Sequence, residues 1–247
     1  MYTALFGGYD ELIEIPYYDS SCCDYICFTD DENLKSSSWE IRVVTLTLAA
    51  NMMNRMYKIL PHKFLQDYDG SLYIDANYVI TKDLSGLIEE NLEDSNFIAM
   101  RHSERNCVYW EGLACVVERK SDFDMVVRQL VSYRNSGFPA NYGLSNNSIL
   151  LRSHNEPSLI SLMNSWWAEL NKFTQRDQLS LQFLLWTHNV DIRYVDDAFV
   201  QPNPYVRWVS HKHIKKGLRF RLFRRSRSFV RFVFFFPRFY YKILRYI

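Results

Sequence analysis

The chain has 247 residues, of which 48% are hydrophobic and 16% aromatic, and its formal net charge is +1. This length predicts one large domain with a sizeable core, although two small domains are also compatible with it. No stretch has the pattern of a Ser/His/Asp hydrolase elbow, a Walker loop or a GxGxxG fingerprint, so the sequence gives these three classes no support.

The near-zero net charge conceals a strong asymmetry along the chain. No Asp or Glu follows Asp197, whereas 13 Lys and Arg lie from Arg207 onward. Subtracting these 13 from the 29 basic residues leaves 16 against 28 acidic residues, so the body carries −12 and the C-terminal part +13. We therefore expect a domain over residues 1–205 and a separate tail over residues 206–247, each facing different partners.

Two strands are predicted near the N-terminus, over residues 2–6 and 25–29. The first ends in Phe6-Gly7-Gly8-Tyr9-Asp10, and the second ends at Asp30. Glycines after the first strand of an α/β fold let backbone amides approach a bound nucleotide. Gly7-Gly8 is equally compatible with an ordinary turn.

The five cysteines are an odd number, and the N-terminus has no basic leader typical of a signal peptide. Both features predict free thiols in a reducing, cytosolic environment. A zinc site at Cys22-Cys23-x-x-x-Cys27 is the alternative, but no second CxxC or paired histidines complete it.

A strand is predicted over residues 39–44 and a helix over residues 46–60, which Pro61 ends. Arg55 and Lys58 lie on neighbouring turns of this helix, close to His62. Two interpretations stay open for them: a solvated basic face, or a positive clamp for a diphosphate.

The stretch Gly70-Ser-Leu-Tyr-Ile-Asp-Ala-Asn-Tyr78 predicts a short buried strand after a turn. Side chains two apart on an extended chain point the same way, so Asp75 and Asn77 leave the strand end as a pair of oxygen ligands. Mg²⁺ or Mn²⁺ prefers such ligands together with substrate phosphates. The alternative is a plain polar turn.

Strands and helices alternate over the rest of the body. Strands are predicted over residues 97–100 and 148–152, and helices over 83–88, 108–118, 122–134, 156–170 and 178–188. This alternation predicts an α/β domain. Asn155 is expected to cap the helix that begins at residue 156. Asp177, at the start of the last helix, is either a helix cap or a carboxylate at the rim of a sugar site.

Several motifs, taken in order, resemble a known family. They are Leu5-Phe-Gly-Gly-Tyr-Asp10, Asp24-Tyr-Ile-Cys-Phe-Thr-Asp30, Lys58-Ile-Leu-Pro-His62, Tyr73-Ile-Asp-Ala-Asn77, Arg101-His102 with Arg105, and Arg176-Asp-Gln-Leu-Ser180. Together they resemble the glycosyltransferase-like domain formerly catalogued as a domain of unknown function, found in bacterial polysaccharide loci and in plant proteins linked to mucilage pectin. The resemblance covers roughly residues 2–197.

This resemblance implies a GT-A-like α/β domain with a central mixed, mostly parallel sheet flanked by helices, which transfers a sugar from a nucleotide-diphospho-sugar. Asp75 and Asn77 would stand where such enzymes carry a metal-binding Asp-x-Asp, for Mn²⁺ or Mg²⁺. Donor-binding residues would be Phe6, Gly7, Gly8, Asp30, Arg55, Lys58, His62 and Arg101. Asp177 and Glu111 are the candidate catalytic carboxylates, because an inverting transferase needs a base for the acceptor proton.

The tail combines basic and aromatic residues, and its charges interrupt every window long enough to span a membrane. We expect it to bind an anionic membrane surface, with aromatic rings at the headgroup boundary. Binding to nucleic acid is disfavoured by the acidic body, and packing on the body or a second subunit is the other alternative.

The leading hypothesis is a cytoplasmic hexosyltransferase, peripheral on the inner face of the membrane, that acts on a glycan or lipid-linked acceptor in surface polysaccharide or lipopolysaccharide synthesis. The alternatives are a catalytically inactive transferase fold serving as a membrane scaffold, which the amide at position 77 favours, and a lipid or glycan hydrolase, for which no nucleophile or metal triad is found.

Overall fold

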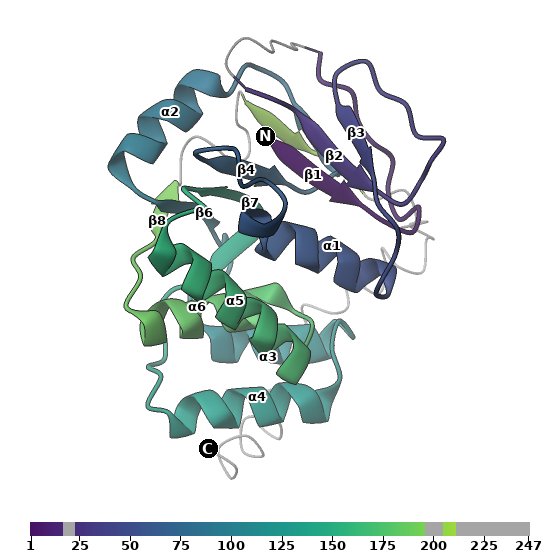
Figure 1. Cartoon of the computed structure of the whole chain (residues 1–247). Helices are drawn as coiled ribbons and strands as arrows, with labels where there is room; N and C mark the ends of the chain where they lie inside the picture. The colour runs from purple at the N-terminus through teal and green to yellow at the C-terminus, as the bar shows by residue number, and fades with distance from the viewer. Residues whose placement is uncertain (17–22, 196–204, 211–247) are drawn as a thin grey trace.

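The computed structural model describes residues 1–16, 23–195 and 205–210 (Figure 1). Its centre is a seven-stranded sheet in the order β3-β2-β1-β4-β7-β6-β8. Every neighbouring pair is parallel except those of β7, which is antiparallel to β4 and β6. The predicted α/β class, with a mixed and mostly parallel sheet, is therefore confirmed. The strands are β1 (Tyr2–Leu5), β2 (Ile26–Thr29), β3 (Glu40–Val43), β4 (Ser71–Ile74), β6 (Phe97–Arg101), β7 (Ser145–Arg152) and β8 (Arg193–Val195).

Helices cover both faces of this sheet. The helices are α1 (Ala50–Ile59), α2 (Ser85–Asp94), α3 (Val108–Val117), α4 (Phe123–Asn135), α5 (Pro157–Lys172) and α6 (Asp177–His188), with a short 3₁₀ turn η1 (Pro61–Lys63) after α1. Side chains of α1, α5 and α6 pack on one face, and α2 packs on the other (Figure 1). Strand β4 shows why both faces need cover: Tyr73 is buried on one side, and Leu72 and Ile74 on the other.

A second, two-stranded sheet pairs β5 (Tyr78–Ile80) with β9 (Val206–Trp208). Val206 is fully buried in the same apolar cluster as Ile74 and Ile80. The ordered body therefore continues past the predicted boundary at residue 205, because β9 needs β5 to complete its backbone hydrogen bonds. The predicted membrane-associating tail from residue 211 onward lies outside the described residues.

Most predicted elements occur within a few residues of their expected bounds. The helix expected from residue 46 begins only at Ala50, and the strand expected from residue 148 begins earlier, at Ser145. The cap expected at Asn155 is wrong: its side-chain amide instead donates to the carbonyls of Gln66 and Tyr68, and α5 begins without a side-chain cap. Tertiary contacts hold the side chain of Asn155 away from the helix, so its amide oxygen does not accept from the first N–H groups of α5.

The described cysteines, namely Cys23, Cys27, Cys107 and Cys115, are all free, as predicted. Among the described residues, no group of three or more His, Cys, Asp or Glu is placed to hold a metal ion, and Cys22 of the zinc alternative lies outside them. The described helices are all too short or too polar to cross a bilayer.

Candidate active site

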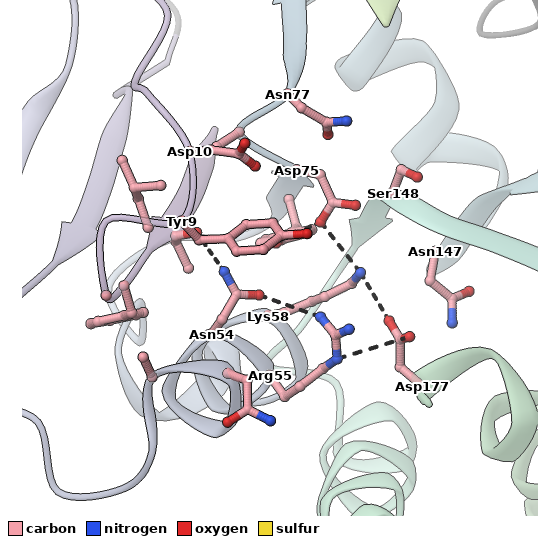
Figure 2. Close-up of a pocket in the computed structure, with 18 of the residues that line it drawn as sticks. Tyr9, Asp10, Asn54, Arg55, Lys58, Asp75, Asn77, Asn147, Ser148 and Asp177 are labelled. Atoms are coloured by element: carbon pink, nitrogen blue, oxygen red, sulfur yellow. Dashed lines mark hydrogen bonds and ion pairs between the residues drawn. The ribbon is translucent and has the colours of Figure 1, made fainter. Parts of the chain in front are cut away.

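A cavity of about 750 Å³ opens at the carboxyl ends of β1 and β4 (Figure 2). Ligands of α/β proteins bind at this edge of the sheet, where parallel strands end and loops begin. Because β7 runs antiparallel to β4, its first residues lie at the same edge, and the backbone N–H of Asp75 donates to the carbonyl of Ser148 at 2.9 Å. Helix α1 and the beginning of α6 close the remaining walls.

The glycine turn after β1 forms one wall. Gly7 has a φ of +67°, and a Cβ added to it would lie 2.8 Å from the Cβ of Ala50. Its N–H donates to Asp30 Oδ1 at 2.9 Å, so Asp30 fixes the turn from behind. Phe6, Gly7, Tyr9 and Asp10 line the cavity, whereas Gly8 and Asp30 do not. Glycine is therefore required at position 7 both by the positive φ and by the close packing against Ala50 of α1.

Helix α1 presents Arg55 and Lys58 to the cavity. Lys58 is only 3% exposed, and its ammonium lies 2.9 Å from Asp177 Oδ2 and 3.5 Å from Asp75 Oδ1. Arg55 Nε lies 4.0 Å from Asp177 Oδ1 (Figure 2). The alternative of a solvated basic face is therefore wrong for Lys58, because its charge is buried between two carboxylates.

A second buried cation holds the backbone beneath Lys58. Arg152 is fully buried, and its guanidinium donates to the Lys58 carbonyl at 2.8 Å and to the Tyr2 hydroxyl at 2.7 Å. The Tyr2 hydroxyl in turn donates to the Lys58 carbonyl at 3.1 Å. These donors fix the end of α1, where Pro61 prevents the helix from continuing.

Asp75 and Asn77 follow β4 and lie on the same side of the cavity (Figure 2). Asp75 Oδ1 accepts a hydrogen bond from the Tyr73 hydroxyl at 2.8 Å. Asn77 Nδ2 donates to the carbonyl of Val209 at 3.2 Å, and the carbonyl of Asn77 accepts from the N–H of Val209 at 2.9 Å. Because Val209 takes the amide nitrogen, the side-chain oxygen of Asn77 turns towards Asp75 (Figure 2). A carboxylate and an amide oxygen placed together fit a hard divalent cation.

Asp177 is the first residue of α6 and is 4% exposed. The predicted alternative, a plain helix cap, does not hold, since Arg176 occupies the cap position and no side chain caps the helix. Burial alone would raise the pKa of Asp177, but Lys58, Arg55 and Arg176 outweigh it and hold that pKa well below its ordinary value. Asp177 is therefore a permanently ionised hydrogen-bond acceptor and a weak proton acceptor.

Three further predicted site residues lie outside the cavity lining. Glu111 is buried on α3, where its Oε2 accepts from Arg105 Nε at 2.5 Å. His62 is buried in η1, and burial lowers its pKa. The guanidinium of Arg101 lies over the ring of Tyr194 at 4.5 Å. The structure thus does not bring Glu111, His62 or Arg101 together with Asp177.

The wall opposite α1 was not anticipated from the sequence. It consists of amide, hydroxyl and basic side chains from the start of β7, the start of α6 and the turn after α3. Its sequence signals are a run of polar residues before an apolar strand and the motif Arg176-Asp-Gln-Leu-Ser180. Its residues are Lys120, Asn146, Asn147, Ser148, Arg176 and Gln178.

A comparison of the sequence with known protein families identifies the family of this chain. The family model described as TOD1/MUCI70, glycosyltransferase-like domain, matches residues 27–200. The chain belongs to this family. The predicted resemblance is therefore confirmed, and the match includes Asp75, Asn77 and Asp177, whereas the glycine turn after β1 precedes it.

Among curated proteins, "Probable hexosyltransferase MUCI70" of Arabidopsis thaliana is 26% identical over an alignment of 208 positions, which covers 72% of this chain. The chain spans about a third of the length of that relative, 35%. Among solved structures, the apo form of mouse xyloside xylosyltransferase 1 superposes with a TM-score of 0.43 at 11% identity, covering 71% of this chain and 72% of that one. That likeness is too slight to carry an inference about this member of the family.

Proposed function

We propose that the cavity binds a nucleotide-diphospho-sugar and that the protein transfers the sugar to a glycan or lipid-linked acceptor in surface polysaccharide or lipopolysaccharide synthesis. The observation that carries this proposal is the cluster at the end of β4, where Lys58 lies between Asp75 and Asp177 and Asn77 lies on the same side of the cavity as Asp75. Family membership supports the reaction class.

The charges of the cavity suit a diphosphate. Its lining holds the basic residues Arg55, Lys58, Lys120 and Arg176 against the acidic residues Asp10, Asp75 and Asp177. Basic groups arranged around a cavity bind phosphate oxygens through charge-assisted hydrogen bonds. The volume of about 750 Å³ is also within the ordinary range of ligand sites.

Asp75 and Asn77 would hold Mn²⁺ or Mg²⁺ together with the phosphates of the donor. Such an ion, when bound, supplies positive charge to the departing diphosphate. The residues of the chain do the remaining work: Lys58 and Arg55 stabilise the same negative charge, and Tyr73 and Lys58 fix the orientation of the Asp75 carboxylate.

Asp177 would stabilise the positive charge that develops on the sugar as the diphosphate leaves. Its lowered pKa keeps it ionised throughout, which suits this role better than proton abstraction. Glu111, the other carboxylate predicted to be catalytic, pairs with Arg105 and would shape the loop before α3. Glu111 would then position Arg105 and its loop and would not contact the sugar.

Thermal unfolding of the purified chain with UDP-, GDP- and CDP-sugars, with and without Mn²⁺, tests the proposal. A ligand at a hundred times its dissociation constant should stabilise the fold by about 2.7 kcal/mol. We expect a shift with one nucleotide family that grows with Mn²⁺ and is lost in Asp75→Ala. Full activity in a well-folded Asp75→Ala variant would contradict the metal role.

A catalytically inactive scaffold is the second candidate. The observation that favours it is the engagement of both metal-site residues by the protein: Asp75 by Tyr73 and Lys58, and Asn77 by Val209. A folded chain that binds none of these nucleotide sugars would support this candidate.

We further propose that the tail holds the protein at an anionic membrane surface, on the cytoplasmic, inner face. From residue 211 onward the tail has 12 basic residues interspersed with aromatic ones, which supports this proposal, and Val209, just before it, contacts Asn77. The full chain should sediment with vesicles that contain anionic lipid and not with neutral ones. Replacing Arg219, Arg221, Arg224 and Arg225 by Gln should weaken the association, and equal binding to both vesicles would contradict it.

A further inference from the structure

Asn147 of β7, in the wall of the cavity opposite α1, has an unused hydrogen-bond donor. Asn147 is 2% exposed and lines the cavity. Its Oδ1 accepts from the Ser145 hydroxyl at 2.6 Å, whereas its Nδ2 has no hydrogen-bond partner within the described part of the chain. A buried amide donor without a partner costs free energy, so it indicates a ligand atom that completes it.

A chain of hydrogen bonds fixes the orientation of this amide. The Tyr194 hydroxyl donates to Gln182 Oε1 at 3.1 Å, and Gln182 Nε2 donates to Ser145 Oγ at 3.2 Å. Ser145 has one hydroxyl proton, which it donates to Asn147 Oδ1. Each hydrogen bond therefore fixes the orientation of the next side chain, and at the end of this series Asn147 Nδ2 faces the cavity. Ser145 and Gln182 are at most 1% exposed, so water does not compete within the chain.

The neighbours of Asn147 indicate what it binds. Its amide nitrogen lies on the same side of the cavity as Asp177, which is an ionised acceptor (Figure 2). A hydroxyl group can accept from the amide and donate to the carboxylate at the same time. A phosphate oxygen can only accept, and it would be repelled by Asp177. The pair of donor and acceptor thus fits a sugar hydroxyl.

We propose that Asn147, oriented by Ser145 and Gln182, recognises a hydroxyl of the transferred sugar together with Asp177. This inference rests on the proposed function and names the residue that determines sugar specificity. A site built to hydrogen-bond a hydroxyl discriminates strongly against an analogue that lacks it, because its own polar groups are then left unpaired.

Calorimetric titration of the full chain separates the sugar contact from the rest of the donor. UDP-glucose, UDP-galactose, UDP-xylose and GDP-mannose are each compared with UDP or GDP alone, with Mn²⁺ present. For the nucleotide sugar that the wild type binds, Asn147→Ala should raise the dissociation constant roughly tenfold and leave that of the nucleoside diphosphate unchanged.

Two more variants sharpen the result. Ser145→Ala removes the group that orients the amide and should cause a smaller loss with the same restriction to the sugar. Asn171→Ala is the matched control, because Asn171 is exposed on α5, far from the cavity lining. A deoxy-sugar donor that lacks the recognised hydroxyl should bind wild type and Asn147→Ala equally.

The outcomes distinguish the inference from the function on which it rests. Equal weakening of the nucleotide sugar and of the diphosphate, or no weakening of either, would overturn the role of Asn147 while leaving the transferase proposal intact. A wild type that binds neither nucleotide nor nucleotide sugar would overturn both.

Discussion

Lys58→Met is the substitution that tests the electrostatics of the cavity most directly. The Lys58 ammonium is buried and lies 2.9 Å from Asp177 and 3.5 Å from Asp75. Methionine fills a similar volume without charge, so the variant removes the cation and leaves both carboxylates in place. Asp177 then keeps Arg55, at 4.0 Å, together with the more distant charge of Arg176.

The expected loss follows from these distances. At an effective dielectric constant of about 20, Coulomb's law gives roughly 6 kcal/mol for two charges this close. Part of that energy offsets desolvation, and removing one partner of a buried pair typically costs about 3–5 kcal/mol. Because Arg55 still pairs with Asp177, we expect the free energy of unfolding to fall by about 3 kcal/mol.

Urea unfolding, followed by the fluorescence of the tryptophans, measures this loss. Trp166 is a suitable reporter, because its indole N–H donates to the backbone carbonyl of Asp177 at 3.2 Å. Lys63→Met, an exposed lysine in η1, is the matched control and should change stability by less than about 0.5 kcal/mol. Combining Lys58→Met with Asp177→Asn should cost less than the sum of the single changes. A loss below about 1 kcal/mol, or strict additivity, would refute the reasoning.

Three further outcomes are expected. Asn77→Asp places a carboxylate against the carbonyl of Val209 and should lower the free energy of unfolding by about 1–3 kcal/mol in the absence of metal; an unchanged thermal midpoint would contradict the contact. Gly7→Ala should destabilise by about 1–3 kcal/mol, measured by urea unfolding, because of its positive φ and the nearby Ala50, whereas Gly8→Ala meets no atom and should cost less. Burial lowers the pKa of His62, His102 and His154, so the unfolded chain binds more protons below about pH 6.5 and stability should fall as the pH decreases from 7 to 5.5. His154→Gln should reduce this pH dependence of the urea midpoint, and an identical slope would count against it.

The elements of the fold could be predicted from sequence because apolar runs and turn residues are local signals. The order of the strands could not, since it depends on pairing between distant segments. Strand β7 shows the consequence. The sequence predicts a strand only from residue 148, so Asn146 and Asn147 lie outside every predicted element. Its antiparallel direction places those polar residues beside Asp75, and only tertiary structure contains that information.

The candidate site was predictable where a motif combined with a strand end, as for Gly7 and Asp75, which both line the cavity. Prediction failed where a side chain finds its partner elsewhere in the fold. Arg101 and His62 belong to the quoted motifs, yet the guanidinium of Arg101 lies over the ring of Tyr194 and His62 is buried in η1. For Asp177, the sequence offered two interpretations, and the buried ammonium of Lys58 decides against a plain cap.

The amide at position 77 has a physical reason in its contacts with Val209, the residue after β9. Val209 accepts a hydrogen bond from the side chain of Asn77 and donates one to its backbone. A carboxylate could not donate to that carbonyl. An aspartate would therefore lose the hydrogen bond to Val209, although it would add a negative charge that favours a metal ion. Asparagine serves both, because its nitrogen satisfies Val209 while its oxygen faces the cavity. Val209 thus links the chain just before residue 211 to the turn that carries Asp75 and Asn77.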